Sequence, residues 1–280
     1  GVSGCGKSSL VRNILYPALQ NELGIYENKP GDYTKIDGDV DSIDFVEFIN
    51  QNPIGRSSRS NPVTYIKAYD EIRNIFSNHK LSKQRGYKAK HFSFNVDGGR
   101  CDKCKGDGEI TIEMQFMADV HLMCDECKGS RFKREILDVK FSEKNIYDVL
   151  NMTINDSLEF FEKSNENKIY RKLLPLKNVG LGYVKLGQSS STLSGGEAQR
   201  IKLASFLGKA NQTKKGVFIF DEPTTGLHTH DIKKLLKSFN ALVDLGNTIV
   251  IVEHNLELIK CSDHIIDLGP AGGENGGHLI

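Results

Sequence analysis

The chain has 280 residues, of which 38% are hydrophobic and 26% are charged. That length suffices for one large or two modest domains with a buried core, and the composition excludes a disordered or fibrous protein. No apolar run approaches the roughly 18 residues of a membrane-spanning helix, and no secretory leader opens the sequence. We therefore expect a cytoplasmic globular protein without a membrane partner.

The net charge is only +1, but the charges are unevenly distributed. Between His79 and Lys105, eight lysines and arginines accompany two aspartates, so this segment carries +6 and the rest of the chain −5. A locally basic segment in an acidic chain is a candidate surface for nucleic-acid phosphates. On charge alone, a solvated loop explains the segment equally well.

The first eight residues, GVSGCGKS, match the phosphate-binding pattern G-x-x-x-x-G-K-[ST]. Glycines are needed because side chains would keep the backbone N–H groups away from phosphate oxygens. Lys7 would neutralise the β- and γ-phosphates and Ser8 would bind Mg²⁺, at the start of a helix that we expect to continue to about Leu19. Pro17 should bend or end this helix. The residues expected to bind the nucleotide here are Gly1, Ser3, Gly4, Gly6, Lys7, Ser8 and Ser9. The alternative is a chance glycine turn before a helix.

The middle of the chain is less regular. Residues 26–48 are acidic and predicted to be irregular, and QNPIGRSSRSN (51–61) is a predicted loop. A short helix is expected from about residue 65 to 76. A strand and then a helix are expected within 132–149, followed by a helical stretch over 154–174.

Four of the six cysteines form two C-x-x-C pairs that are 19 residues apart, which is close to the spacing of structural zinc sites. The predicted ligands are Cys101, Cys104, Cys124 and Cys127. Four thiolates leave no open coordination position, so this Zn²⁺ would hold structure and take no part in catalysis. Two disulfides or free thiols are the alternatives.

Between the two pairs, apolar residues alternate with polar ones, which is typical of a half-buried strand. The apolar positions are Ile110, Ile112, Met114 and Phe116. Residues 120–123 would return the chain, so we predict a hairpin that brings the two cysteine pairs together.

The last ninety residues alternate between predicted helices and buried strands. Helices are expected over Ser194–Leu207 and His230–Leu245, and strands over Val217–Phe220, Thr248–Val252 and Ile265–Leu268. This pattern predicts an α/β fold with a mostly parallel sheet that is covered on both faces.

Three groups near these elements are candidates for phosphate chemistry. Asp221 and Glu222 follow a buried strand, where Asp221 could hold Mg²⁺ and Glu222 could activate water; an acidic pair capping the next helix is the alternative. Ser194, Gly195 and Gly196 begin a helix, which makes them a capping box with Glu197, an anion site, or both. His254 follows the last long strand, where ligands bind in open α/β sheets, although a lone histidine there is more often structural.

Together these motifs resemble the ATP-binding cassette (ABC) family in their order along the chain. The matching segments are the Walker A motif (1–8), the Q-loop (Gln51), the signature (193–200), the Walker B motif (217–222) and the switch histidine (His254). The resemblance implies a P-loop ABC-type ATPase core in which two cassettes sandwich two ATP molecules, each Walker site being completed by the other cassette's signature. It also implies that Gln51 senses Mg²⁺ or the γ-phosphate, that Glu222 polarises water and that His254 contacts the γ-phosphate. His228 stands where most of the family has the D-loop aspartate.

A narrower resemblance covers essentially the whole chain. The segments that carry it are QNPIGRSSRSNP (51–62), HFSFNVDGGRCDKCKGDGEI (91–110), MCDECKGSRF (123–132), LGQSSSTLSGGEAQRIKLA (186–204), DEPTTGLH (221–228) and IVEHN (251–255). These residues resemble the UvrA family, the damage-recognition ATPases of the bacterial excinuclease ABC system of nucleotide excision repair, and most of all the C-terminal cassette of that family. The TTGLH of this family also accounts for His228.

The resemblance implies an ATP-dependent homodimer that binds damaged double-stranded DNA, loads the helicase-like partner UvrB through a half that lies outside this chain, and has no nuclease activity of its own. Its DNA contacts would come from basic residues of the insertion, namely Lys88, Lys90, Arg100, Lys103, Lys105, Arg131 and Lys133. We expect an ATP-binding core in residues 1–62 and 209–280 and a signature and insertion domain in 63–208, with the zinc module at about 91–134. A transporter motor cassette is the main alternative, and a non-enzymatic zinc-binding module is another.

Overall fold

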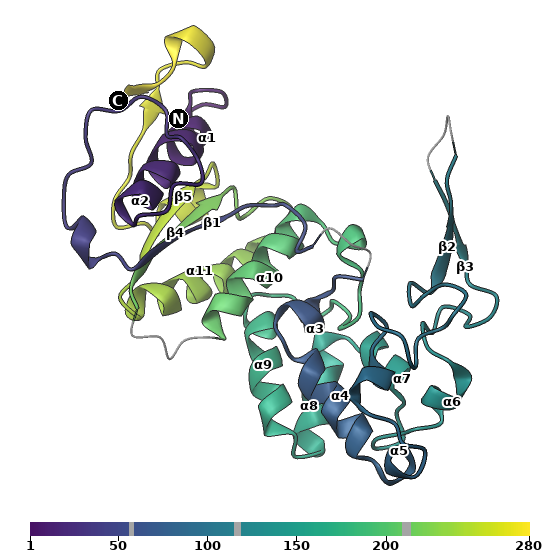
Figure 1. The fold of residues 1–280 in the computed structure, drawn as a ribbon. Coiled ribbons are helices and arrows are strands. Elements are labelled where there is room, and N and C mark those ends of the chain that lie inside the picture. Colours follow the sequence, from purple (N-terminus) through teal and green to yellow (C-terminus); the bar gives the residue numbers. More distant parts are fainter. Residues whose placement is uncertain (56–58, 115–118, 209–213) are drawn as a thin grey trace. The chain divides into compact units, whose positions relative to one another are not determined.

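The structure is a computed structural model that describes residues 1–55, 59–114, 119–208 and 214–280 (Figure 1). It divides into two compact units: residues 1–52 together with 194–280, and residues 53–193. The division after residue 193 differs from the predicted domain boundary at 208, because helix α10 (Gly195–Leu207) belongs to the first unit.

The first unit is built on a parallel sheet in which β4 (Gly216–Asp221) lies between β1 (Phe45–Ile49) and β5 (Thr248–Val252). Strands β4 and β5 agree with the prediction. Strand β1 was missed, since its sequence FVEFI lies at the end of an acidic stretch that was predicted to be irregular. Strand β5 is mostly half-exposed, whereas a buried strand was predicted, because it lies at the edge of the described sheet.

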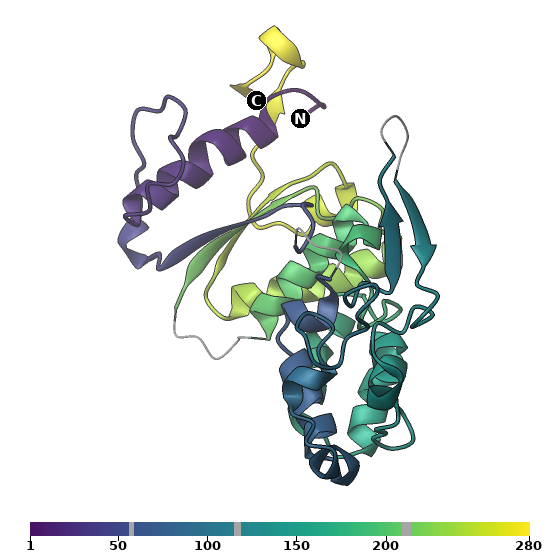
Figure 2. The same cartoon turned by 45° about the vertical axis from the view of Figure 1, so that its right-hand side comes forward.

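Helices cover both faces of this sheet (Figures 1 and 2). Alternate residues of β4 point to opposite faces. Val217 and Ile219 pack in one core with residues of the N-terminal helix, such as Val11. On the other face, Phe218 contacts Phe206 of α10 with ring centroids 5.1 Å apart, and Phe220 contacts Phe239 of α11 (Thr229–Asp244) with centroids 4.7 Å apart. The predicted two-sided α/β arrangement is confirmed.

The N-terminal helix continues through Pro17 and does not end there. It consists of α1 (Lys7–Ser9), a π-helical turn η1 (Leu10–Leu15) and α2 (Tyr16–Glu22). Proline has no N–H to donate to the carbonyl four residues earlier, which is that of Asn13. The Gly31 N–H donates to Asn13 O at 2.8 Å instead, so the lost helical bond is replaced from outside the helix.

The C-terminal part of the first unit contains α12 (Leu256–Ile259), a 3₁₀ turn η5 (Gly273–Asn275), and a short antiparallel pair, β6 (Leu268–Gly269) with β7 (His278–Leu279). A 3₁₀ turn η2 (Val40–Ser42) precedes β1. The predicted strand over 265–268 is wrong for most of its length, since Ile265 and Ile266 are exposed and only Leu268 pairs in a strand.

The second unit is mainly helical. Its helices are α3 (Pro62–Tyr65), α4 (Tyr69–Asn78), α5 (Lys80–Gln84), α6 (Arg134–Leu137), α7 (Ile146–Asn151), α8 (Ile154–Lys163) and α9 (Asn167–Asn178), with 3₁₀ turns η3 (Ala89–Phe92) and η4 (Ser190–Thr192). The strand expected within 132–149 is absent from these described residues. The single helical stretch expected over 154–174 is two helices.

Aromatic side chains form much of the core of the second unit. Tyr69 stacks on Phe94 with ring centroids 5.2 Å apart, and its hydroxyl donates to Phe92 O at 2.7 Å. Phe76 packs on Phe92 with centroids 5.5 Å apart. This core joins helix α4 to the segment that leads into the first cysteine pair.

A hairpin of β2 (Glu109–Ile112) and β3 (Val120–Met123) extends from the second unit (Figure 1). The hairpin was predicted, but the half-buried face that was expected for its first strand is largely exposed. Ile112 and Met114 are 45% and 39% exposed, and among the described residues of the hairpin only Ile110 packs against the cysteine cluster. Phe116 of the predicted alternation lies outside the described residues. Nothing in the described ranges offers a helix with the length and apolar character needed to cross a bilayer.

Candidate functional site

The predicted catalytic residues follow the carboxyl ends of the three parallel strands. Gln51 comes two residues after β1, Glu222 directly follows β4, and His254 is the second residue after β5. Because the carboxyl ends of parallel strands meet at one edge of a sheet, this topology brings distant parts of the sequence together.

Three contacts describe the resulting site. Ser8 Oγ donates to Asp221 Oδ1 at 3.0 Å, which joins the Walker A and Walker B motifs. Gln51 Nε2 donates to the backbone oxygen of Glu222 at 3.3 Å. His254 Nε2 lies 3.7 Å from Glu222 Oε1. A hydroxyl and a carboxylate at hydrogen-bond distance are suitable ligands for Mg²⁺, with Glu222 beside them for a water molecule.

The glycine-rich loop has the backbone of a phosphate cradle. Gly4 and Gly6 have backbone φ angles of 79° and 97°, which residues other than glycine rarely adopt. Lys7 Nζ donates to the carbonyl oxygens of Gly1 and Val2 at 3.0 and 2.7 Å. Lys7 therefore folds over its own loop, where an anion would compete with these two carbonyls for the ammonium group.

Glu222 itself has a left-handed backbone with φ of 46°. This conformation is uncommon for a glutamate and costs on the order of 1 kcal/mol or more, and such residues cluster at functional sites. The Glu222 N–H donates to Val252 O at 2.9 Å, which fixes the carboxylate-bearing residue to the end of β5.

The signature segment forms the predicted capping box at the start of α10. Ser194 Oγ accepts from Glu197 N at 3.2 Å, and Glu197 Oε2 accepts from Ser194 N at 2.8 Å. A Cβ atom on Gly195 would lie 2.9 Å from Gln51 Cβ, and one on Gly196 would lie 2.9 Å from Thr225 O. Both glycines therefore allow close approach within their own chain, while their predicted role as an anion site stays a prediction.

Gln199 is a residue that sequence analysis missed. Its side chain is buried, and Nε2 donates to Ile49 O at 2.8 Å and to Asp221 O at 3.2 Å. Helix α10 thus holds the ends of β1 and β4 together. One turn along the helix, Lys202 Nζ donates to Asn50 O at 3.1 Å, and burial lowers the pKa of this amine.

Glu253 was also missed, although it lies inside the quoted IVEHN segment. Its Oε1 accepts from the Thr224 N–H at 2.8 Å and from the Thr224 hydroxyl. Its Oε2 accepts from the N–H groups of His254 and Asn255 at 2.6 and 2.9 Å. One carboxylate therefore joins the segment after β4 to the segment after β5.

The glycine-rich end of the chain lies against the Walker A loop. The Gly273 N–H donates to Gly4 O at 3.2 Å, and the Gly277 N–H donates to Cys5 O at 2.9 Å. A Cβ atom on Gly272 would lie 2.9 Å from Ser3 O, so the two backbones are in direct contact. Sequence analysis assigned no role to this segment.

The four predicted zinc ligands converge in the second unit, with all four sulfurs within 4.8 Å of one another. The Sγ–Sγ distances are 3.9 Å for Cys101 and Cys124, and 3.5 Å for Cys104 and Cys127. A tetrahedral site with Zn–S bonds of about 2.3 Å needs sulfurs about 3.8 Å apart. All four cysteines are free thiols, so the disulfide alternative is not found. The arrangement fits a zinc ion.

The two cysteine pairs end in turns of the same kind. Lys105 and Gly106 have φ angles of 51° and 90°, and Lys128 and Gly129 have 48° and 81°. A Cβ atom on Gly106 would lie 2.0 Å from Phe94 O, so only glycine fits there. Burial raises the pKa of the Cys127 thiol to about 12, so binding of a metal would have to displace its proton.

The seven predicted DNA contacts have different environments. Arg131 has its guanidinium 5.4 Å from the centre of the Phe94 ring and donates to Gly187 O at 3.2 Å, and Arg100 pairs with Asp97 at 2.7 Å with 15% of its side chain exposed. Contacts within the protein therefore already engage the guanidinium groups of both arginines. Two of the other five form ion pairs at 2.7 Å, Lys103 with Asp125 and Lys133 with Asp102. The remaining three, Lys88, Lys90 and Lys105, are exposed and have no ion pair within the described ranges.

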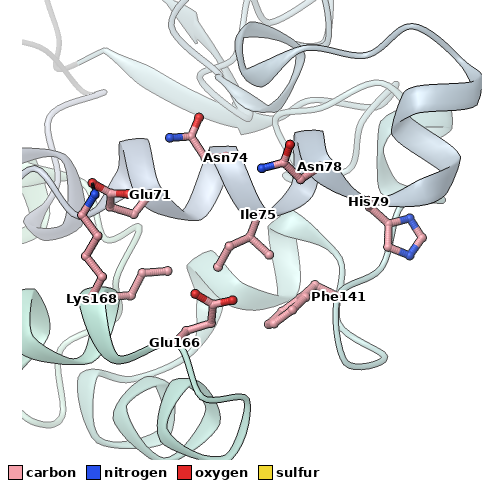
Figure 3. Close-up of a pocket in the computed structure, with 9 residues that line it drawn as sticks. Glu71, Asn74, Ile75, Asn78, His79, Phe141, Glu166 and Lys168 are labelled. Atoms are coloured by element: carbon pink, nitrogen blue, oxygen red, sulfur yellow. Dashed lines mark ion pairs between the residues drawn. The ribbon is translucent and has the colours of Figure 1, made fainter.

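A cavity of about 450 Å³ lies elsewhere in the second unit (Figure 3). Helix α4 contributes Glu71, Asn74, Ile75 and Asn78, and α9 contributes Lys168. Lys168 pairs with Glu71 at 2.9 Å, and this hydrogen bond is the main reason that the pKa of Glu71 is lowered. None of the predicted site residues lines this cavity.

Comparison with known proteins gives consistent results. No protein-family model matches the chain. The chain is 56% identical over its 280 residues to UvrABC system protein A of Clostridium acetobutylicum and 55% identical to that of Staphylococcus epidermidis, and it spans 29% of the length of each. It matches the crystal structure of UvrA2 from Deinococcus radiodurans with a TM-score of 0.90 and 44% identity, covering 100% of this chain and 33% of that one. The predicted resemblance and the predicted ABC-type fold are confirmed.

Proposed function

Since this chain is related along its whole length to one segment of UvrABC system protein A, we propose that it is an ATP-hydrolysing part of a DNA-damage-recognition protein of nucleotide excision repair. The observation that carries the proposal is the meeting of Ser8 with Asp221, and of Gln51 and His254 with Glu222, within one chain. We propose that the protein works in the cytoplasm, where the free thiols would stay reduced.

In the proposed reaction, Lys7 and the N–H groups of the glycine-rich loop bind the phosphates of ATP. Ser8 and Asp221 would hold Mg²⁺, which would supply positive charge to neutralise the phosphates. Glu222 orients the attacking water, and His254 contacts the γ-phosphate. Phosphoryl transfer depends mainly on positioning and on electrostatic stabilisation, so these groups act together.

The composite arrangement is also a proposal. Ser194, Gly195 and Gly196 would complete the Walker site of a second cassette, in a homodimer. The start of α10 suits this role, because a helix N-terminus attracts anions.

ATP hydrolysis tests the enzymatic part. Glu222→Gln should keep ATP binding but lower hydrolysis by about 100-fold or more, since the group that orients the water is lost. Lys7→Ala should abolish ATP binding. Glu22→Gln, at an exposed position at the end of α2, is the matched control and should behave like the wild type. Wild-type turnover by Glu222→Gln would remove Glu222 from its proposed role.

We propose that the four cysteines bind one structural Zn²⁺ and that the insertion binds DNA. The contact groups best placed for this are Lys88, Lys90 and Lys105, because they are exposed and have no ion pair within the described ranges. Phosphate contacts of this kind give affinity without sequence preference, which suits a protein that detects many lesions. Loading of the partner UvrB would depend on the rest of the protein.

Duplex binding at several salt concentrations tests the DNA part. Replacing Lys88, Lys90 and Lys105 by alanine should weaken binding and reduce the dependence of affinity on salt, because fewer counterions are released. A control triple variant at Lys140, Lys144 and Lys177 removes the same charge at exposed positions of the same unit. Equal losses in both triple variants would mean that net charge alone acts. A protein without zinc that is indifferent to duplex DNA would instead favour a transporter motor.

A further inference from the structure

The structure assigns to Glu253 the role of a positioning residue that aligns His254 with Glu222 for ATP hydrolysis. This inference rests on the proposed ATPase function. It concerns a carboxylate that holds together the two segments that carry the reacting side chains.

The hydrogen bonds of Glu253 divide evenly between these segments. Oε1 accepts both donors of Thr224, which is two residues after Glu222. Oε2 accepts the N–H of His254 at 2.6 Å and that of Asn255 at 2.9 Å. The Glu222 N–H, which donates to Val252 O at 2.9 Å, adds a further link between the same segments.

All four partners of Glu253 are donors, so the bridge requires an acceptor at both oxygens. A carboxylate supplies this, and the bonds are charge-assisted and therefore stronger than bonds between neutral groups. A glutamine of the same shape would present an amide NH₂ to one pair of donors. Glutamine therefore breaks one side of the bridge while keeping the volume of the side chain.

Both reacting side chains depend on backbone that this bridge fixes. His254 Nε2 lies 3.7 Å from Glu222 Oε1, and both side chains are more than 40% exposed, so side-chain packing does little to hold them. Asn255 caps the start of α12, its Oδ1 accepting from Glu257 N at 3.0 Å. The bridge therefore fixes the main chain on both sides of His254.

A double-mutant cycle tests this role in the intact protein. ATP binding and single-turnover hydrolysis would be measured for wild type, Glu253→Gln, His254→Ala and the double variant. We expect Glu253→Gln to lower the hydrolysis rate by about tenfold or more, with ATP affinity changed less than about twofold. The double variant should lose clearly less than the product of the two single losses, because Glu253 acts through the alignment of His254 with Glu222. Losses that multiply, or no loss in Glu253→Gln, would overturn the inference.

Control variants separate positioning from general damage. Thr224→Ser keeps both donors and should retain activity, whereas Thr224→Val removes the hydroxyl and should lower the rate. Glu257→Gln makes the same chemical change at an exposed position four residues further on. It should have no effect.

The inference can fail separately from the proposed function. If the wild-type protein does not hydrolyse ATP, the proposed function fails, and amide hydrogen exchange then tests the bridge alone. Glu253→Gln should speed exchange of the Thr224, His254 or Asn255 N–H by about tenfold, because a charge-assisted bond is lost. Unchanged exchange at all three would overturn the bridge itself.

Discussion

Gln199 shows how one buried side chain can set the geometry of a site that it does not enter. Its amide donates to the backbone oxygens of Ile49 and Asp221, the last residues of two neighbouring strands. Gln51 and Glu222 follow these strands closely. The positions of these proposed catalytic groups therefore depend on a residue of helix α10.

Gln199→Ala should destabilise the first unit. It removes two hydrogen bonds, leaves two backbone oxygens without this donor and opens a cavity, so the free energy of unfolding should fall by about 2–3 kcal/mol. Urea unfolding followed in the first unit measures this change. Asn240→Ala, at an exposed position in α11 of the same unit, is the control and should change stability by less than about 0.5 kcal/mol. A similar small change for Gln199→Ala would show that the strand ends are held by other contacts.

At the residue scale, sequence patterns predicted the groups whose spacing is fixed by chemistry. Ser8, Asp221 and the four cysteines belong to this class, because a nucleotide or a metal demands particular residue types at particular intervals. Gln199 and Glu253 were not predicted to act. Their partners are mostly backbone groups of distant segments, and any residue type supplies such groups, so no pattern in the sequence marks the pairing.

At the scale of elements, the glycine-rich C-terminal segment packs against the Walker A loop, and Gly272 offers a selective test of this contact. Its φ is −94°, so alanine is permitted by the backbone, but the added Cβ would lie 2.9 Å from Ser3 O. We expect Gly272→Ala to push the loop out of position and to weaken ATP binding by about tenfold, as overpacking typically costs about 1–3 kcal/mol.

Gly273→Asn is the control for this variant. Gly273 has φ of 67° and nothing within 4 Å of a built Cβ, and asparagine tolerates that backbone. Its N–H still donates to Gly4 O. Equal ATP affinities of Gly272→Ala and the wild type, measured by titration, would show that the contact does not constrain the loop.

Two errors in the predicted elements, the missed strand β1 and the expected burial of the hairpin, have a common cause. Strand β1 contains Glu47 within an acidic stretch, and only its pairing with β4 makes it a strand. The hairpin was predicted correctly from alternation, but its burial was not, since alternation indicates a strand with two different faces and cannot show whether anything covers either face. Long-range partners decided both cases.

At the scale of the whole molecule, the two units contain different parts of the proposed machinery. The residues of the proposed nucleotide site all belong to residues 1–52 and 194–280, and the four cysteines all belong to residues 53–193. Loss of the metal should therefore affect the second unit selectively. Metal binding contributes directly to the folding free energy of small zinc modules, because the preformed site does not exist in the unfolded chain.

Cys101→Ser should release zinc and loosen the second unit while ATP binding persists. Cys101 is buried, and its N–H donates to Arg131 O at 2.9 Å, so the ligand is joined to the segment that follows the second cysteine pair. Zinc content should fall from one ion per chain to none, and proteolysis within residues 91–134 should become faster, with ATP affinity within about twofold of wild type. Cys261→Ser, at an exposed cysteine outside the cluster, should change none of these quantities. If Cys101→Ser also abolished ATP binding, the two units would fold as one cooperative body, and the metal would stabilise the nucleotide site as well.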